Sequence, residues 1–278
     1  MPDPSVRTSF TLAVLLLTTA IVPVSVVTNG QAAEFEIRRI TESVQKKTRF
    51  LNSEFVVAGS PRIQSSRKVP LLIFLHGAGG RGQEIGRIRR MIQPIHGKAQ
   101  RMVSEPFLMV APQSLMGTRE IAATWLPSDL DELLEHLKKT LPVDETRIYL
   151  TGTSMGGYGT WVWAAHSPQH FAAVAPVVGG LGKGGPKDVS PELEAWAKQL
   201  TRVPVWAFAG ANDRVVPAER SERMIRMIRQ QGGKQARLTV YPDEGHGAGR
   251  RVYESKEFYS WMFSLRKSPE QKLDGKNP

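Results

Sequence analysis

Short, unbroken runs of apolar residues alternate along this chain with segments whose apolar residues recur every three or four positions. The unbroken runs have the length of a strand and are typical of strands buried on both faces of a sheet. They occupy residues 69–75, 107–112, 148–150, 171–178 and 203–210, and residues 236–241, where apolar and polar residues alternate, are expected to form the last strand. The periodic segments predict amphipathic helices at 129–139, 192–200, 218–231 and 251–265. This alternation predicts the α/β fold class, with a mostly parallel, twisted sheet and helices on both faces.

Two segments depart from the alternation. Residues 34–57 mix short apolar stretches with polar ones, and we expect two short strands that form an antiparallel edge of the sheet. Residues 81–105 are rich in arginine and place isoleucine and methionine at helical spacing, with a break expected at Pro94. This stretch fits an amphipathic surface helix packed on the sheet, and it also fits a cap that faces the substrate.

The stretch 147–163 carries the first candidate chemistry. A short apolar run enters a turn of sequence Gly-Thr-Ser-Met-Gly, and a helical stretch then extends to about His166. A G-x-S-x-G pattern between a buried strand and a helix is typical of a nucleophile turn, because the glycines let the strand and the helix approach closely while the serine is strained. We therefore predict that Ser154 is a catalytic nucleophile at the carboxyl end of a central strand.

A second glycine-rich turn runs from His76 to Gly80, directly after an apolar run. It lacks the lysine and the hydroxyl residue of a P-loop, and its spacing does not match a dinucleotide fingerprint. With a nucleophilic serine downstream, the turn is better interpreted as an oxyanion loop, whose backbone N–H groups bind a developing negative charge. We predict the N–H groups of Ala78 and Met155 as the two donors, and His76 as a residue that fixes the loop by hydrogen bonding.

A serine hydroxyl needs a base within hydrogen-bond reach, and the base needs a carboxylate to orient it. His246 follows the last predicted strand and Asp213 follows the strand before it, so the order along the chain is Ser, Asp, His. Because the carboxyl ends of parallel strands meet at one edge of a sheet, we expect these three side chains to converge. Asp188 is the alternative acid, but it lies in a Gly/Pro-rich loop that does not directly follow a predicted strand.

Two residues between the predicted strand 107–112 and the next helix are candidates for contact with the substrate. Gln113 and Trp125 both lie in this exit loop, and Trp125 fits either the core or a pocket. No metal is expected, because Pro168 separates His166 from His170 and no third ligand is evident. No cofactor is expected either, since the serine, histidine and aspartate chemistry needs none. The remaining histidines, His96 and His136, are interpreted as surface residues.

Composition narrows the class of protein. The chain has 278 residues, of which 41% are hydrophobic and 23% charged, as in one globular α/β domain. The absence of cysteine excludes disulfides, a cysteine nucleophile and thiolate metal sites. The net charge of +11 comes from scattered basic residues without aromatic interleaving, so nucleic-acid binding is not expected. A basic surface also fits electrostatic association with an anionic envelope or polysaccharide.

The N-terminal segment has the pattern of a targeting sequence. Arg7 precedes a long uncharged stretch, and small residues follow that stretch. This pattern predicts a secretory signal peptide cleaved after Ala32 or Ala33, and hence a secreted or periplasmic protein, with a retained membrane anchor as the alternative. The expected organisation is a signal peptide at 1–33, a catalytic domain at 34–265 and a polar, disordered tail at 266–278.

Together these motifs resemble those of α/β-hydrolases. More narrowly, they are similar to secreted bacterial serine esterases of the phospholipase/carboxylesterase and polyhydroxybutyrate-depolymerase-like group, often described as predicted peptidases related to prolyl oligopeptidase. The resemblance covers about residues 45–265 and is carried by residues 74–82, 111–113, 147–161, 213–217 and 244–246. It implies Ser154, Asp213 and His246 as a triad, with Ala78 and Met155 as oxyanion donors. Unlike larger relatives, the chain has no propeller and no sizeable inserted lid, which implies an open site.

The expected function is therefore an exported serine hydrolase that cleaves small-molecule or polymer-linked carboxylic esters through an acyl-enzyme on Ser154. A serine peptidase would use the same machinery with a different leaving group. A non-catalytic binding protein on a hydrolase scaffold is the third hypothesis, and it predicts the loss of a triad member.

Overall fold

The computed structural model describes residues 34–59, 67–117, 125–182, 185 and 187–267. The predicted signal peptide lies outside these ranges, as does all of the predicted tail except Arg266 and Lys267. These two residues are held in place: the backbone N–H of Lys267 donates to the Thr146 carbonyl at 2.9 Å, and Arg266 pairs with Asp144 at 3.3 Å. The expectation of a disordered tail from residue 266 onward is therefore wrong for its first two residues.

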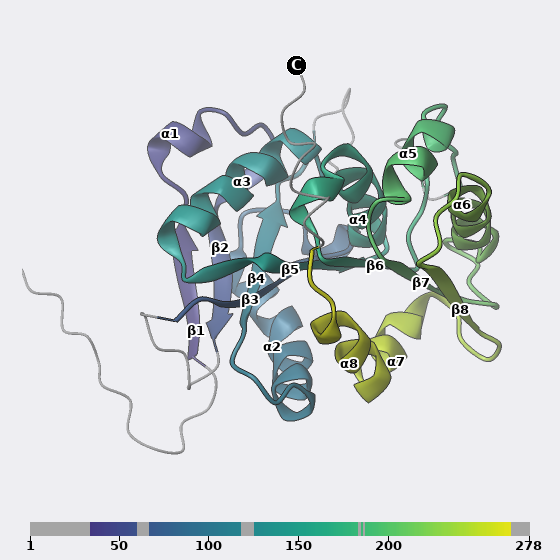
Figure 1. The fold of residues 1–278 in the computed structure, drawn as a ribbon. Helices are drawn as coiled ribbons and strands as arrows, with labels where there is room; N and C mark the ends of the chain where they lie inside the picture. Colours follow the sequence, from purple (N-terminus) through teal and green to yellow (C-terminus); the bar gives the residue numbers. More distant parts are fainter. Residues whose placement is uncertain (1–33, 60–66, 118–124, 183–184, 186, 268–278) are drawn as a thin grey trace, which may run out of the picture. The chain divides into compact units, whose positions relative to one another are not determined.

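Eight strands in the described residues form one sheet, in the order β1-β2-β4-β3-β5-β6-β7-β8 (Figure 1). The strands are β1 (Glu34–Arg39), β2 (Leu51–Gly59), β3 (Val69–Leu75), β4 (Leu108–Ser114), β5 (Val143–Thr153), β6 (Ala173–Val177), β7 (Val205–Gly210) and β8 (Ala236–Tyr241). β1 pairs antiparallel with β2, and β2 pairs antiparallel with β4, whereas every other neighbouring pair is parallel. The predicted α/β class and its antiparallel edge are confirmed.

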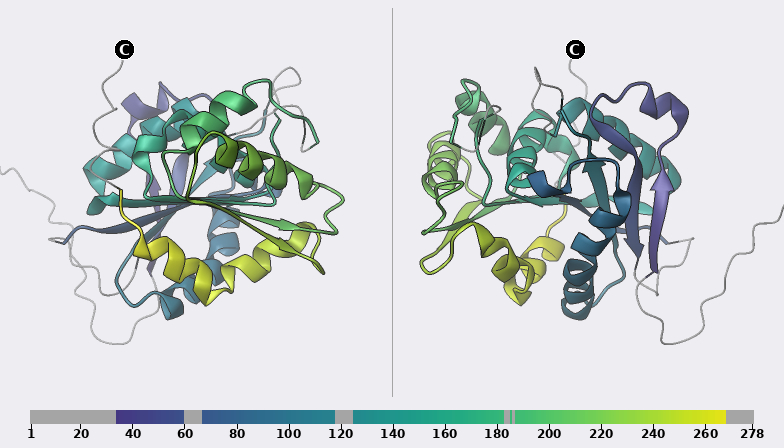
Figure 2. Two further views of the ribbon diagram at one scale, coloured as in Figure 1. Left: turned by 45° about the vertical axis from the view of Figure 1, so that its right-hand side comes forward. Right: turned by 180° about the vertical axis from the view of Figure 1, so that it is seen from behind.

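Helices cover both faces of the sheet. They are α1 (Glu42–Gln45), α2 (Ile85–Met102), α3 (Pro127–Thr140), α4 (Met155–His166), α5 (Leu193–Leu200), α6 (Glu219–Gln230), α7 (Gly249–Tyr253) and α8 (Lys256–Ser264), with 3₁₀ turns η1 (Ala78–Gly80), η2 (Pro168–His170) and η3 (His246–Ala248). Helices α3 to α6 lie on one face, and α2, α7 and α8 lie on the other (Figure 1). Figure 2 shows the same division from two further directions.

The two faces of the sheet carry two separate hydrophobic clusters, and strand β3 contributes to both. Leu71, Ile73 and Leu75 pack among residues of α3 to α6, whereas Leu72 and Phe74 pack among residues of α2, α7 and α8. Successive side chains of a strand point to opposite faces, so a strand covered on both sides must be apolar at every position. This requirement explains the unbroken apolar run that identified the strand.

Helix α2 does not break at Pro94, contrary to the sequence-based expectation. Its buried positions Ile88, Ile92, His96 and Ala99 form one stripe on the sheet, and their burial stabilises the helix on both sides of the proline. Proline removes the hydrogen bond to the carbonyl four residues earlier and crowds that carbonyl, which belongs to the exposed residue Arg90 and can be hydrated.

The predicted closing helix, 251–265, is in fact two helices. It separates at Ser255, whose backbone is extended and whose Oγ accepts a hydrogen bond from the Phe258 N–H at 3.3 Å. A serine N-cap of this kind starts a new helix, because it satisfies an amide that has no partner within the helix. No helix in the described ranges is long and apolar enough to cross a bilayer.

Two histidines that were expected on the surface are inside the protein. His136 is 8% exposed and meets the edge of the Phe55 ring, and His96 is fully buried between Phe35 and Phe107. Neither ring nitrogen of His96 has a hydrogen-bond partner. Burial disfavours the charged imidazolium and lowers the pKa of His96 to about 4.

This burial predicts a loss of stability in mild acid. The unfolded chain binds a proton at His96 below about pH 6.5, while the folded protein does so only below about pH 4, so the free energy of unfolding falls as the pH drops through that window. The full difference in pKa lowers the free energy of unfolding in acid by about 3 kcal/mol, and we expect His96→Leu to abolish this loss. Its melting temperature relative to wild type should therefore rise more at pH 5 than at pH 7.5, as measured by differential scanning fluorimetry.

His166→Leu is the matched control for this prediction, because His166 is exposed at the end of α4. The control should follow the wild-type pH profile. An unchanged profile in His96→Leu would contradict the assignment of the acid sensitivity to His96.

Candidate active site

The turn between β5 and α4 holds Ser154 in a strained backbone conformation, with φ 59° and ψ −116°. This region is unfavourable for a residue with a side chain. Gly152 and Gly156 permit it, since a Cβ at Gly156 would lie 1.9 Å from the Leu75 carbonyl oxygen and one at Gly152 would lie 2.5 Å from the Gly156 oxygen. The Ser154 N–H donates to the Val177 carbonyl at 3.0 Å and anchors the turn to β6.

The structure brings Ser154, Asp213 and His246 together at the carboxyl ends of β5, β7 and β8. The Ser154 Oγ lies 3.0 Å from His246 Nε2, and His246 Nδ1 lies 2.8 Å from Asp213 Oδ2. Along the chain, His246 lies 92 residues after Ser154 and 33 residues after Asp213. Their convergence follows from the parallel sheet, whose strands all deliver their loops to one edge.

The contacts of Asp213 fix the orientation of its carboxylate group. Its side chain is fully buried, and its Oδ1 accepts hydrogen bonds from the N–H groups of Val215 and Val216 at 2.8 and 2.9 Å. The other oxygen, Oδ2, is therefore the one left to face His246. Asp188, the alternative acid, is exposed beside Gly182 and Gly185 and is not hydrogen-bonded to His246.

This arrangement defines which nitrogen of His246 carries the proton. A carboxylate can only accept, so Nδ1–H donates to Asp213 Oδ2, and Nε2 is left to accept the hydrogen bond of the Ser154 hydroxyl. An imidazole in this form can take the serine proton, and the carboxylate can stabilise the imidazolium that results.

The oxyanion loop lies against the nucleophile turn: a Cβ on Gly77 would come within 3.5 Å of the Ser154 Cβ. Ala78 is the first residue of η1 and Met155 is the first residue of α4. The N–H group at the first position of a helix has no acceptor within the helix. Neither amide is therefore used by a hydrogen bond within its own helix.

His76 holds this loop, as predicted, and does not act as a base. Its Nε2 accepts from the Ser114 N–H at 3.0 Å, so its Nδ1 carries the proton and donates to the Gly77 carbonyl at 2.7 Å. Burial lowers the pKa of His76 to about 4, so the ring is neutral at physiological pH.

Gln113 and Trp125 do not contact the pocket, which corrects the expectation that they bind substrate. Gln113 is fully buried, and its amide donates to the Gly80 carbonyl at 2.9 Å while accepting from Asn52 at 2.8 Å. Trp125 is 2% exposed and donates from Nε1 to the His76 carbonyl at 3.1 Å. Both side chains support the oxyanion loop from inside the protein.

A pocket of about 720 Å³ opens beside Ser154 and His246. Part of its wall is residues of α2 that the sequence analysis did not assign to the site, namely Met91, Pro94, Ile95 and Lys98. Helix α2 therefore fits both earlier interpretations: one face packs on the sheet, and the other faces the candidate site. The amphipathic period of this segment could have indicated these residues, if the face turned away from the sheet had been considered as part of a site.

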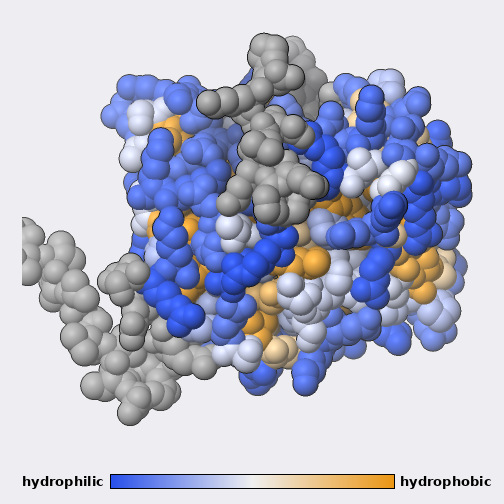
Figure 3. Space-filling view, in the orientation of Figure 1, coloured by the Kyte–Doolittle hydropathy of each residue, from blue (hydrophilic) through white to orange (hydrophobic). Residues whose placement is uncertain are grey.

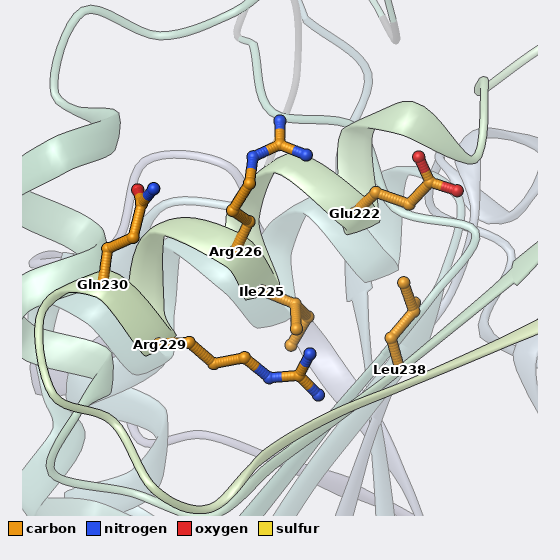
Figure 4. A pocket seen from close by; sticks show the side chains of 6 residues that line it. All are labelled: Glu222, Ile225, Arg226, Arg229, Gln230 and Leu238. Atoms are coloured by element: carbon orange, nitrogen blue, oxygen red, sulfur yellow. The ribbon is translucent and has the colours of Figure 1, made fainter.

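A second hollow, of about 570 Å³, lies against α6 and β8 and holds none of the candidate residues (Figure 4). Arg229 in this hollow is tied to the Ala236 carbonyl at 2.9 and 3.1 Å. Across the described ranges, no cluster of three acidic or histidine side chains is placed to hold a metal ion. The face of the molecule in Figure 3 is mostly hydrophilic, with hydrophobic side chains gathered in small areas.

Comparison with known proteins gives the context of this geometry. The family described as "Dienelactone hydrolase family" matches residues 108–258. A "Putative carboxymethylenebutenolidase" of Salmonella typhimurium is 38% identical over 109 residues, which are 37% of this chain and 37% of that protein. A Yersinia pestis protein of the same description is 31% identical over 189 residues, 59% of this chain and 65% of that one. The matches therefore span less than two thirds of these relatives.

Among solved structures, one described as a thermostable esterase superposes with a TM-score of 0.64 and 26% sequence identity. The match covers 77% of this chain and 59% of that chain. The range matched by the family model, residues 108–258, contains Ser154, Asp213 and His246.

Proposed function

Because the chain belongs to the dienelactone hydrolase family of the α/β-hydrolase superfamily, we propose that it is a serine hydrolase that cleaves carboxylic esters through an acyl-enzyme on Ser154. The observation that carries this proposal is the continuous hydrogen-bond relay from Ser154 through His246 to Asp213. A binding protein on the same scaffold would have no need to keep this relay or the strained turn that presents the serine.

Acylation begins when the Ser154 Oγ attacks the ester carbonyl carbon. The hydroxyl proton passes to His246 Nε2, and Asp213 stabilises the imidazolium through Nδ1–H. The carbonyl oxygen becomes an oxyanion that accepts hydrogen bonds from the N–H groups of Ala78 and Met155, and one such donor contributes about 3 kcal/mol to lowering the barrier. The carbon–oxygen bond to the alcohol then breaks, and Nε2 gives its proton to the departing oxygen.

Deacylation repeats these steps with water. His246 takes a proton from a water molecule, whose oxygen attacks the acyl carbon. When the second tetrahedral intermediate collapses, the carboxylic acid leaves and the Ser154 Oγ recovers its proton from Nε2. The cycle needs no cofactor, because every proton and electron pair is accounted for by the ester, water and these side chains.

Labelling with a fluorophosphonate tests the nucleophile directly. We expect the reagent to attach to the peptide that contains Ser154, as located by mass spectrometry, and denatured protein to remain unlabelled. Absence of labelling in the folded protein would support the binding-protein hypothesis instead.

Turnover of matched substrates separates an esterase from a peptidase. An amide has a poorer leaving group than an ester, so a site built for esters should hydrolyse aryl esters and leave the corresponding peptide anilides unchanged. Faster turnover of the anilides would assign the same machinery to a peptidase. An ester panel with feruloyl, acetyl-sugar and hydroxybutyrate members would then indicate whether the natural substrate is a small molecule or is linked to a polymer.

We further propose that the protein is exported, with residues 1–33 removed. The support is the charge and hydropathy pattern of this segment, with small residues at positions 32 and 33. N-terminal sequencing of protein recovered from the periplasm or medium should begin at Ala33 or Glu34. An intact N-terminus in the membrane fraction would support the retained anchor.

A further inference from the structure

One wall of the pocket beside Ser154 is a single stripe of helix α2. Met91, Pro94, Ile95 and Lys98 line the pocket. Residues at this spacing lie on the same side of a helix, and the stripe extends for about 10 Å along the axis at about 1.5 Å per residue. The part of the pocket lined by α2 therefore extends along the axis of this helix.

A further part of the wall belongs to the segment that begins at the base, His246. Gly249, Arg250 and Tyr253 of α7 line the pocket, and so do Phe74 and Thr153, next to the nucleophile turn. The beginning of the α2 stripe is tied to the oxyanion loop, because Arg87, one turn before Met91, donates to the Gly79 carbonyl of that loop at 3.0 Å.

Lys98, at the end of the lining stripe of α2, joins this helix to the end of α7. Lys98, two turns beyond Met91, donates from Nζ to Oε1 of Glu254, the residue that follows α7. Hydrogen bonding to Lys98 lowers the pKa of Glu254, which favours the carboxylate form that accepts this hydrogen bond. The pocket lining on α2 therefore ends at an ammonium group that is held by a carboxylate.

The lining between these ends is apolar and accessible. Among the described residues, four large hydrophobic side chains are exposed, and two of them, Met91 and Val215, line this pocket at 36% and 47% exposure. Exposed hydrophobic side chains gathered beside a candidate nucleophile indicate a surface that is covered when a ligand binds.

We propose that this pocket is a slot for the hydrocarbon chain of the ester, and that Lys98, held by its ion pair with Glu254, closes the end of the α2 stripe and sets the chain length. The inference rests on the proposed function and specifies the substrate class of the same site, a medium-chain ester. A chain of roughly eight carbons with staggered torsions extends over the length of the α2 stripe. A longer chain meets the ion pair.

The test is a series of p-nitrophenyl acyl esters from acetyl to palmitoyl, with a parallel series of acetate esters of alkanols of increasing length. In the series whose chain enters the slot, kcat/KM should rise about four-fold per added methylene until the slot is filled, and then fall. The series that responds shows whether the acyl or the alcohol half binds there. Equal kcat/KM values throughout both series would contradict the proposal that the pocket binds a hydrocarbon chain.

Variants at both ends test the end wall. Lys98→Ala and Glu254→Ala should each move the optimum to longer chains, whereas Ile95→Trp, which fills the middle of the slot, should move it to shorter ones. Lys47→Ala is the matched control, because Lys47 also joins two distant elements through an ion pair, with Glu132, but lies outside the pocket. An optimum that stays the same in Lys98→Ala and Glu254→Ala would overturn the role of the ion pair.

Failure of this inference is distinguishable from failure of the proposed function. Wild-type protein that hydrolyses no member of either series contradicts the esterase assignment itself. If the wild-type protein hydrolyses all members equally, the esterase assignment stands and the proposal that the pocket binds a hydrocarbon chain is wrong.

Discussion

Ser154→Ala is expected to lower kcat for ester hydrolysis by about 10⁶-fold, as removal of a triad serine does in other serine hydrolases. The relay ends at the Ser154 Oγ, and no other hydroxyl is hydrogen-bonded to His246 in the described part of the chain. Without this oxygen the protein keeps its oxyanion donors and its pocket, so substrate binding should remain. The measurement is initial-rate kinetics with an aryl ester, together with a thermal melt to show that the fold is kept.

The control for this variant is Ser264→Ala, which removes an exposed serine hydroxyl at the end of α8. This change should leave kcat and KM at the wild-type values. If Ser154→Ala retained most of its turnover, the nucleophile would have to be sought elsewhere.

Asp213→Asn is expected to lower kcat by about 10⁴-fold while leaving the fold intact. The asparagine oxygen can still accept the hydrogen bonds from Val215 and Val216, so the loop keeps its shape. Its NH₂ group, however, replaces the oxygen that faces His246 Nδ1 and donates where the carboxylate accepted. The imidazole proton then moves to Nε2, which can no longer accept the proton of Ser154.

Asp188→Asn is the matched comparison, because it makes the same chemical change at the alternative acid, on an exposed loop. Steady-state kinetics should show wild-type rates for it. A loss of rate in Asp188→Asn together with normal rates in Asp213→Asn would reverse the assignment of the acid.

The local pattern of apolar residues and glycines was sufficient to predict most of the fold and the candidate residues of the hydrogen-bond relay. The run 69–75 was readable as a strand because burial on both faces requires an apolar residue at each position. Ser154 was readable because a strained turn between a strand and a helix requires glycine on both sides. These signals lie within a few residues of each other, so they do not depend on what the rest of the chain packs against.

The errors have a shared origin in contacts between distant segments. Pro94 was expected to end a helix, and the propensity of proline was outweighed by the buried stripe of α2 on the sheet. Gln113 was expected to face substrate, yet its amide satisfies the Gly80 carbonyl, 33 residues away, inside the protein. His96 was expected on the surface and is buried between Phe35 and Phe107.

The sequence by itself determined the α/β class and most of the order of strands and helices, and it singled out Ser154 and His246 as a candidate pair, because hydrophobic periodicity and turn chemistry are local properties of the chain. Tertiary structure decided that Asp213 and not Asp188 meets His246, that α2 supplies a wall of the pocket, and that Lys98 meets Glu254, 156 residues later. The physical reason is that hydrogen bonds, ion pairs and pocket walls depend on distances through space, and packing of the two hydrophobic clusters on the sheet sets those distances.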